Sequence, residues 1–410
     1  MDRISFIGDL MFERQYIKSR QTRTGYDFSG LLINLKSLLG DSTIVVANLE
    51  SVFAGSECKY TASLYSFNTP TEALDVLKEC NISVVTTANN HCLDRGIKGI
   101  QKTIQALDQR RILHTGTYID PNETDRSLIR EINGVRYAFM SYTYGTNSLE
   151  NKILLNQSEL GHINLLKPQE NDKLAQTEKQ PSAFREILNT LSQKLFSSEA
   201  RMRIKKTLSM TLNVPIVDDN LKIDYNFLDK LRQDIKKTKS ESDVQFMCLH
   251  CGGQFNANPG NFTKEIVRVL HQEGIHYIIA THPHVVQLCS VDNCGNITFY
   301  SIGNLTISPS SIYVLHELKP EYSIIPHFYF DKDILGNSVL RRLTFSIVKV
   351  VEGIDNSLTV FPISRLWEQS SEDERENLLY DMRFIYNRVT NSNTNIAEIQ
   401  DEYEIGLKQI

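Results

Sequence analysis

The sequence lacks the features that direct a protein into a membrane or onto nucleic acid. None of its 410 residues belong to an apolar run of about 18 residues or more, so no transmembrane helix is predicted. The N-terminus, MDRISFIGDLMF, has no apolar secretory segment and enters a strand-like run directly. A net charge of −5 and a pI of about 6.1 predict no basic surface for nucleic acid.

Cysteine is also sparse. The seven cysteines are an odd number and form no tandem CxxC pairs, which is typical of reduced thiols in the cytoplasm. The sequence as given therefore predicts a cytoplasmic protein. Two alternatives stay open: association with a membrane through a partner, and an anchor that the given sequence omits.

Strand-like and helical segments alternate through the first third of the chain. Apolar, β-branched runs occupy residues 4–7, 43–47, 82–86 and 135–142, and helical periodicity separates them. This order predicts an α/β fold whose sheet is covered on both faces by helices. Residues 296–363 contain further strand-like runs, which predict antiparallel pairing and a second sheet.

Two segments depart from this rhythm. Residues 150–240 are polar and rich in Lys, Gln and Ser, and they predict a helical insertion. Its expected helical stretches lie near Ala183–Phe196, Met202–Leu212 and Phe227–Ile235. Residues 367–410 predict an acidic helical tail, which leaves residues 1–366 as the main domain.

Side chains that can bind metal follow the ends of several predicted strands. They are Asp9, Asn48, Glu50, Asn90, His91, His250, His282 and His284. The carboxyl ends of strands in an α/β sheet face one crevice, so these side chains are expected to lie together. Oxygen and imidazole ligands suit divalent Mn, Zn or Fe, and two such ions bridged by a carboxylate can clamp a phosphoryl group.

The His282-Pro283-His284 loop follows the apolar run at residues 275–280. Proline fixes its own φ and keeps the preceding residue extended, so the two imidazoles should point in separate directions. This arrangement suits two metal positions better than one. Two surface histidines in a turn are the alternative interpretation of this loop taken alone.

Several motifs together resemble those of a known family. They are Ile7–Met11, Asn48–Glu50, Ala88–His91 with Asp94 and Gly96, Tyr142–Asn147, His250–Gly253, His282–Gln287 and Tyr300–Asn304. In this order, over roughly residues 3 to 310, the series resembles the CapA family of poly-γ-glutamate capsule-biosynthesis proteins. Those proteins resemble calcineurin-like metallophosphatases, which implies a two-sheet sandwich flanked by helices.

The resemblance also implies roles for individual residues. Asp9 and His284 would hold one ion, Asn90, His250 and His282 another, and Glu50 would bridge them. His91 would act as general acid or stabilise the leaving oxygen. Further residues would orient ligands or contact an anionic substrate: Asn48, Asp94, Tyr144, Asn147, Gln254 and Asn304. Two structural alternatives stay open, in which Asp94 caps the helix near Ile97 and Asn304 shapes a turn.

Three positions depart from the pattern of these relatives. Met11 stands where metallophosphatases usually carry a histidine, although a hydrophobic residue there is itself like the CapA family. It predicts a weakened site for the ion of Asp9 and His284. Gln254 replaces a carboxylate and cannot act as a general base, and Thr281 replaces a glycine. The fold is expected to be unaffected, whereas catalytic turnover remains open.

Three functions are consistent with these features. The first is a metal-dependent hydrolase of phosphate esters or related anionic bonds in the biosynthesis of capsule or another envelope polymer. The second is a non-catalytic factor that binds polyglutamate or its synthase. The third is a metal-dependent hydrolase of γ-glutamyl amides. The expected partners are an anionic polymer or a phosphorylated small molecule, together with a capsule synthase complex.

Overall fold

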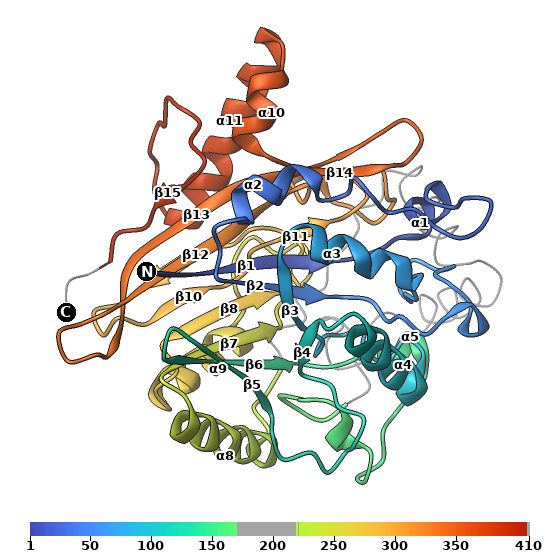
Figure 1. Ribbon diagram of the computed structural model, residues 1–410, viewed down its shortest axis with the longest axis vertical. Helices are drawn as coiled ribbons and strands as arrows, with labels where there is room; N and C mark the ends of the chain where they lie inside the picture. Colours follow the sequence, from blue (N-terminus) through green and yellow to red (C-terminus); the bar gives the residue numbers. More distant parts are fainter. Residues whose placement is uncertain (170–218, 220, 408–410) are drawn as a thin grey trace, which may run out of the picture.

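Two β-sheets form the centre of the protein, with helices outside them (Figure 1). The computed structural model describes residues 1–169, 219 and 221–407. The first sheet has nine strands, ordered β14-β13-β12-β1-β2-β3-β4, with β11 paired to β1 and β15 to β13. The second sheet has six strands, ordered β5-β6-β7-β8-β10-β9. The predicted α/β fold with two sheets is therefore confirmed.

The strands of the first sheet combine both pairing directions. Its parallel strands are β1 (Asp2–Leu10), β2 (Ile44–Leu49), β3 (Ile82–Thr86), β4 (Leu113–Thr115) and β11 (Asn304–Thr306). Its antiparallel strands are β12 (Tyr322–Lys332), β13 (Ser338–Glu352), β14 (Leu358–Pro362) and β15 (Tyr403–Glu404).

The second sheet is parallel at its centre and antiparallel at its edges. The central strands are β6 (Val135–Thr143), β7 (Val244–His250), β8 (Tyr277–Thr281) and β10 (Ile297–Phe299). The edge strands are β5 (Ser127–Ile132) and β9 (Cys289–Val291).

Helices lie outside the two sheets. Those of the first half are α1 (Arg14–Ser19), α2 (Lys36–Leu39), α3 (Asp75–Glu79), α4 (Gly96–Gln109) and α5 (Ser148–Asn151). Those of the second half are α8 (Tyr225–Glu241), α9 (Asn261–Gln272), α10 (Ile363–Gln369) and α11 (Glu372–Thr390). Short 3-10 helices occupy Ile33–Leu35, Ser56–Cys58, Thr71–Leu74, Leu160–His162 and His316–Leu318. Among the described residues, no helix is both long enough and apolar enough to cross a membrane.

The hydrophobic core is layered because alternate strand residues point to opposite faces. Between the sheets, Phe6 of β1 packs against Phe246 of β7 with ring centroids 4.9 Å apart. On the outer face of the first sheet, Val45 packs in a cluster with residues of α3 such as Leu77. On the outer face of the second sheet, Met247 belongs to a cluster with residues of α8 and α9. The order is helix, sheet, sheet, helix.

Two sequence-based expectations about the arrangement of the layers are wrong. The inner faces of the two sheets share one apolar layer, which α11 also joins, whereas helices alone were expected on both faces of a sheet. The strands of residues 322–362 are antiparallel as predicted, but they extend the first sheet through β1–β12 pairing and do not form a second one. Both errors have one cause: an apolar periodicity indicates a buried face without specifying what covers it.

Only part of the expected insertion lies within the described residues. Of its three helical stretches, Ala183–Phe196 and Met202–Leu212 lie outside the described residues, and Phe227–Ile235 lies within α8. In the C-terminal segment, α11 buries Leu378, Met382 and Ile385 in the layer between the sheets, and β15 pairs with β13.

Candidate metal centre

The polar strand ends of both sheets meet at one place. The first sheet contributes Asp9, Asn48, Glu50, Asn90 and His91, and the second sheet contributes His250, His282 and His284. All of these side chains are buried, and hydrogen bonds or close contacts connect them. The expectation that these strand ends converge is met, although two sheets rather than one supply them.

A local irregularity of β1 directs Asp9 into the centre. The pairing of β1 with β2 shifts register between Ile7 and Asp9, as in a β-bulge, which re-aims the side chain that follows. Gly8 permits this because a Cβ there would lie 2.0 Å from the carbonyl oxygen of Gly303. Asp9 Oδ1 accepts a hydrogen bond of 2.7 Å from Asn48 Nδ2, and Asp9 Oδ2 accepts one of 3.2 Å from the backbone N–H of His282.

Glu50 lies in the middle of the centre. Its side chain is fully buried, and neither carboxylate oxygen has a hydrogen-bond partner among the described residues. Glu50 Oε1 lies 3.5 Å from His250 Nε2, 3.9 Å from His91 Nε2 and 4.0 Å from His284 Nε2. A buried carboxylate without donors is costly unless a cation neutralises it. The residues around Glu50 therefore fit a metal ion.

Two groups of three side chains can hold such ions, and Glu50 belongs to both. In one group Glu50 joins His250 and His282, and in the other it joins Asp9 and His284. Within each group the ligand atoms lie within 4.8 Å of one another. A carboxylate shared by two adjacent groups has the position of a bridging ligand. The nitrogen and oxygen donors suit divalent Mn, Zn or Fe.

The first group, which we call the His282 group (Glu50, His250 and His282), has a further ligand candidate. Asn90 Oδ1 lies 2.8 Å from His250 Nε2, and His282 Nδ1 lies 3.1 Å from the same nitrogen. The other nitrogen of His250, Nδ1, contacts Thr281 Oγ1 at 3.0 Å. The three atoms Asn90 Oδ1, His250 Nε2 and His282 Nδ1 therefore converge on one point beside Glu50.

The second group, which we call the His284 group (Asp9, Glu50 and His284), is arranged differently. His284 Nδ1 lies 2.8 Å from Asn304 Oδ1 and 3.3 Å from Asp9 Oδ2. Asn304 Nδ2 donates to the backbone carbonyl of His284, so both ends of this amide hold the same residue. The sequence-based expectation that His282 and His284 serve different groups matches this geometry.

The His-Pro-His loop has an unusual backbone. His282 has a φ of +98° and His284 a φ of +58°, in the left-handed region that residues with a side chain seldom adopt. The expectation that Pro283 keeps His282 extended is therefore wrong. Such strain persists only where the surroundings hold it, and it is typical of ligand-binding sites. On the outer side of the loop, Tyr144 Oη contacts His282 Nε2 at 3.1 Å, which fixes the orientation of this ring.

His91 lies at the edge of the centre, held on three sides. Its Nδ1 is 2.7 Å from Asp94 Oδ2, and its ring stacks on Phe67 with centroids 4.3 Å apart. Asn147 Nδ2 lies 3.2 Å from Nδ1 of His91, and Asn147 Oδ1 accepts a hydrogen bond from Asn90. Asp94 makes no capping hydrogen bond at the start of α4, so the helix-cap interpretation of this residue is wrong.

The imidazoles of the centre differ in their proton affinity. Burial opposes the protonation of His284, but the charge of Glu50 and the hydrogen bond and charge of Asp9 outweigh it and raise the pKa of His284 to about 9. Burial, together with the neighbouring His250 and His284, lowers the pKa of His282 well below its usual value. Burial also opposes charge on His91, yet Asp94 raises its pKa overall.

The pKa of Asp9 also reflects its neighbours. Burial alone would raise this pKa, but the hydrogen bond with His284 and the charges of His250 and His284 lower it overall. Asp9 and His284 therefore form a buried ion pair when no metal is bound.

Two of the three departing positions, Met11 and Gln254, lie outside this cluster. Met11 is buried in the apolar cluster beneath the first sheet, and its backbone is held by Thr306. Gln254 is half-buried in the turn after β7, and its side chain makes no hydrogen bond to the centre within the described part of the chain. The adjacent residue, Phe255, donates its backbone N–H to the carbonyl of Pro283, so this turn supports the His-Pro-His loop.

Two contributors were not recognised from the sequence. Thr281 was noted only as a replacement of glycine, yet its hydroxyl contacts His250. Phe67 had no signal at all, because it lies in an irregular segment remote in sequence from His91. A threonine directly before two candidate ligands is a recognisable signal for the first of these.

Comparisons with known proteins agree with the motif series. Residues 3–309 match the family described as "Bacterial capsule synthesis protein PGA_cap". The PGA biosynthesis protein CapA of Bacillus subtilis (strain 168) is 21% identical over 302 residues, 73% of this chain and 62% of that protein. The capsule biosynthesis protein CapA of Bacillus anthracis is 21% identical over 304 residues, 73% of this chain and 58% of that protein. The matched region is less than two thirds of either relative.

Solved structures are less similar. A hypothetical protein from Thermus thermophilus is 14% identical with a TM-score of 0.37, covering 88% of this chain and 99% of its own. A phosphatase from Mycoplasma pneumoniae is 12% identical with a TM-score of 0.36, covering 92% and 98%. At these scores neither structure informs the arrangement of this chain. The family match, in contrast, includes every strand that supplies the centre, from Asp9 to Asn304. The chain belongs to the bacterial capsule synthesis protein family, as its resemblance to the CapA family predicted.

Proposed function

We propose that this protein is a metal-dependent hydrolase that acts on a phosphate ester or a related anionic substrate in capsule or envelope-polymer biosynthesis. The observation that carries the proposal is Glu50, a fully buried carboxylate without hydrogen-bond partners among the described residues that is common to both candidate metal groups. A bridging carboxylate between two ions is typical of sites that clamp a phosphoryl group.

The residues of the centre divide into three tasks. His250, His282 and Asn90 would hold one divalent ion, Asp9 and His284 the other, and Glu50 both. Bound ions of this kind supply Lewis-acid chemistry and lower the pKa of water. His91 would donate a proton to the leaving oxygen, since Asp94 raises its pKa and so keeps a proton on the ring.

The same proposal covers the organisation of the chain. Residues 1–366 would form the metal-binding domain with residues 150–240 inserted in it, and residues 367–410 would form an acidic tail. A capsule synthase and its anionic polymer would be the partners, since the two named relatives are described as a PGA biosynthesis protein and a capsule biosynthesis protein.

The test combines metal analysis with hydrolysis of a generic aryl phosphate. Purified protein should contain Mn, Zn or Fe, and Glu50→Gln, which keeps the size of the side chain but removes its charge, should abolish both metal and hydrolysis. His276→Ala is a matched control, because His276 hydrogen-bonds Asn296 away from the centre.

Two results would overturn the hydrolase. One is wild-type protein that holds no metal after incubation with each ion. The other is hydrolysis that survives Glu50→Gln. Metal-free protein that still binds a γ-linked glutamate oligomer would favour the non-catalytic polymer-binding factor. Release of free glutamate from that oligomer would favour the γ-glutamyl amide hydrolase.

A further inference from the structure

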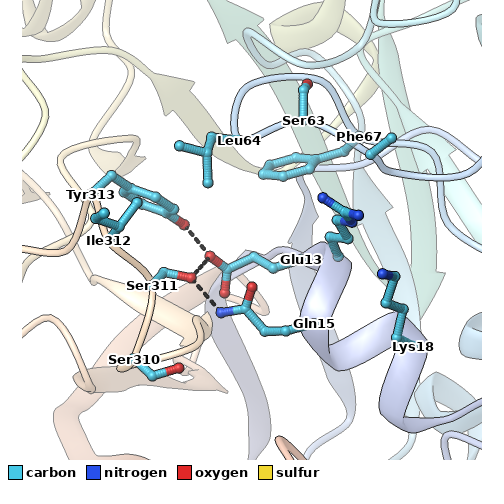
Figure 2. Close-up of a pocket in the computed structure, with 12 residues that line it drawn as sticks. Glu13, Gln15, Lys18, Ser63, Leu64, Phe67, Ser310, Ser311, Ile312 and Tyr313 are labelled. Atoms are coloured by element: carbon cyan, nitrogen blue, oxygen red, sulfur yellow. Dashed lines mark hydrogen bonds between the residues drawn. The ribbon is translucent and has the colours of Figure 1, made fainter. Parts of the chain in front are cut away.

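A cavity of about 460 Å³ lies beside the metal centre (Figure 2). It is bounded by the start of α1, by residues 62–67 and by the loop at residues 310–313. We call it the Lys18 pocket, after the side chain that Figure 2 shows on one side of it, across from Tyr313. None of the proposed metal ligands lines this cavity. It is therefore a second site that needs its own explanation.

The Lys18 pocket and the metal centre share a wall. Phe67 lines the pocket, stacks on His91 at 4.3 Å and donates its backbone N–H to Asp94 Oδ2 at 2.6 Å. On the opposite wall, the ring of Tyr313 lies 6.3 Å from that of Phe255, which lies 5.9 Å from the ring of His284. The residues that hold the edge of the centre thus also shape the pocket.

The acidic residue of the pocket is turned away from any ligand. Glu13 is only 4% exposed, and its carboxylate accepts hydrogen bonds from the backbone N–H of Ser308, from Ser311 Oγ at 2.5 Å and from Tyr313 Oη at 2.7 Å. Figure 2 shows the bonds from Ser311 and Tyr313. These donors satisfy the carboxylate inside the protein. Glu13 therefore anchors the 308–313 loop that forms the far wall of the pocket.

The basic residues that line the pocket are exposed to solvent. Lys18 is exposed on the last turn of α1, and its ammonium has no ion-pair partner within the described ranges. Arg14 lines the same cavity one turn earlier and is also exposed. With Glu13 satisfied by its own loop, the pocket presents the Lys18 ammonium and the apolar surfaces of Phe67 and Leu64.

We propose that the Lys18 pocket binds an anionic group of the substrate that neighbours the group held at the metal centre. This rests on the proposed function and narrows its substrate to an extended polyanion with at least two negative groups joined by a carbon chain. Lys18 would pair with the second negative group, while Phe67 and Leu64 would contact the carbon chain. Carboxylate and phosphate share this recognition chemistry.

Direct binding measurements test the pocket separately from catalysis. The full-length protein is titrated with a fluorescently labelled γ-linked glutamate oligomer and, in a second arm, with a fluorescently labelled glycerol phosphate oligomer, in which carbon chains join the phosphates. Lys18→Glu should weaken binding by about fivefold or more, and rising salt should reduce the difference, as expected for an exposed ion pair. The arm with the larger loss identifies carboxylate or phosphate as the preferred group.

A control separates the pocket from the overall charge of the protein. Lys236→Glu makes the same charge change on an exposed residue of α8 that does not line the cavity, and it should leave binding unchanged. Equal affinities of wild type and Lys18→Glu in both arms would overturn the pocket, as would equal losses in the two variants. Binding that depends on Lys18 in a protein without any hydrolytic activity would keep the pocket and reject the hydrolase. Metal-dependent hydrolysis, together with binding that does not depend on Lys18, would keep the hydrolase and reject the pocket.

Discussion

The two metal groups on either side of Glu50 differ in the charge that they carry before any ion binds. In the His282 group, burial and neighbouring imidazoles lower the pKa of His282, so this ring is neutral and ready to act as a ligand. In the His284 group, the pKa of His284 is raised to about 9, and the ring forms an ion pair with Asp9. The His282 group offers an unprotonated ligand nitrogen. In the His284 group, the protonated ring of His284 neutralises the charge of Asp9.

This difference indicates an order of metal binding. An ion in the His282 group needs no proton to leave His282, whereas an ion in the His284 group must displace a proton from His284. We therefore expect the first ion to bind in the His282 group and the second to bind more weakly. The sequence also predicted weaker metal binding in the His284 group, because Met11 stands where metallophosphatases usually carry a histidine.

The largest effect should come from removing one imidazole at a time. His282→Ala should lower the affinity for the first ion by more than about a hundredfold, because this ring is a direct ligand rather than a supporting residue. His284→Ala should leave one ion bound and remove only the second. Metal analysis and calorimetric titration of both variants measure this. If both variants lose the same ion, the distinction between the two groups is wrong.

Removing the support of a ligand should have a smaller effect. Thr281→Val keeps the shape of the side chain but removes the hydroxyl that contacts His250 Nδ1. Loss of such a supporting contact typically costs about 10- to 100-fold in metal affinity. Titration with metal should show this loss for the first ion alone. An equal loss for both ions would mean that Thr281 acts through the fold of the loop instead.

The pH dependence of binding sharpens the comparison further. Because a proton must leave His284, affinity for the second ion should rise by about tenfold per pH unit until the pH reaches about 9. Affinity for the first ion should change much less between neutral pH and this value. Titrations at several pH values at constant ionic strength measure both slopes. Parallel slopes for the two ions would contradict the assignment of the proton to His284.

The proton on His284 gives the stability of the metal-free protein the opposite dependence on pH. The pKa of His284 is raised from 6.5 to about 9, so its ion pair stabilises the fold fully below about 6.5 and is lost as the pH rises through about 9. Metal-free protein should therefore unfold more readily at high pH, where the second ion binds best. Denaturant titrations with and without metal compare the two trends.

The smallest effect on metal binding should come from placing a histidine at position 11. Met11 lies in the apolar cluster, so Met11→His should reduce the free energy of unfolding by about 1–3 kcal/mol, as expected for a buried polar group without a partner. It should not strengthen binding of the second ion. Tighter binding with unchanged stability would show that residue 11 can still reach the His284 group.

Much of the centre was predictable because its ligands directly follow buried strands. Asp9, Glu50, His250 and His282 each end or follow a continuous apolar run, and in α/β proteins such strand ends meet at one edge. The sequence also assigned His282 and His284 to different groups, although the extended backbone expected at His282 does not occur.

The remaining features depend on contacts between distant segments. An apolar periodicity predicted the strand at residues 322–330 but could not show that β12 pairs with β1 across more than 300 residues of chain. Phe67 reaches His91 from an irregular segment that carries no periodic signal. The Lys18 pocket likewise depends on Glu13 anchoring a loop near residue 311, a contact that no local pattern encodes.

The close approach of Gly8 to Gly303 has a consequence for the order in which the protein is made. Asp9, Glu50 and His91 leave the ribosome early, whereas His250, His282 and His284, and the strand that holds Asn304, come from the second half of the chain. Until that half has been synthesised, β1 cannot pair with β11, and neither group of candidate ligands can be complete.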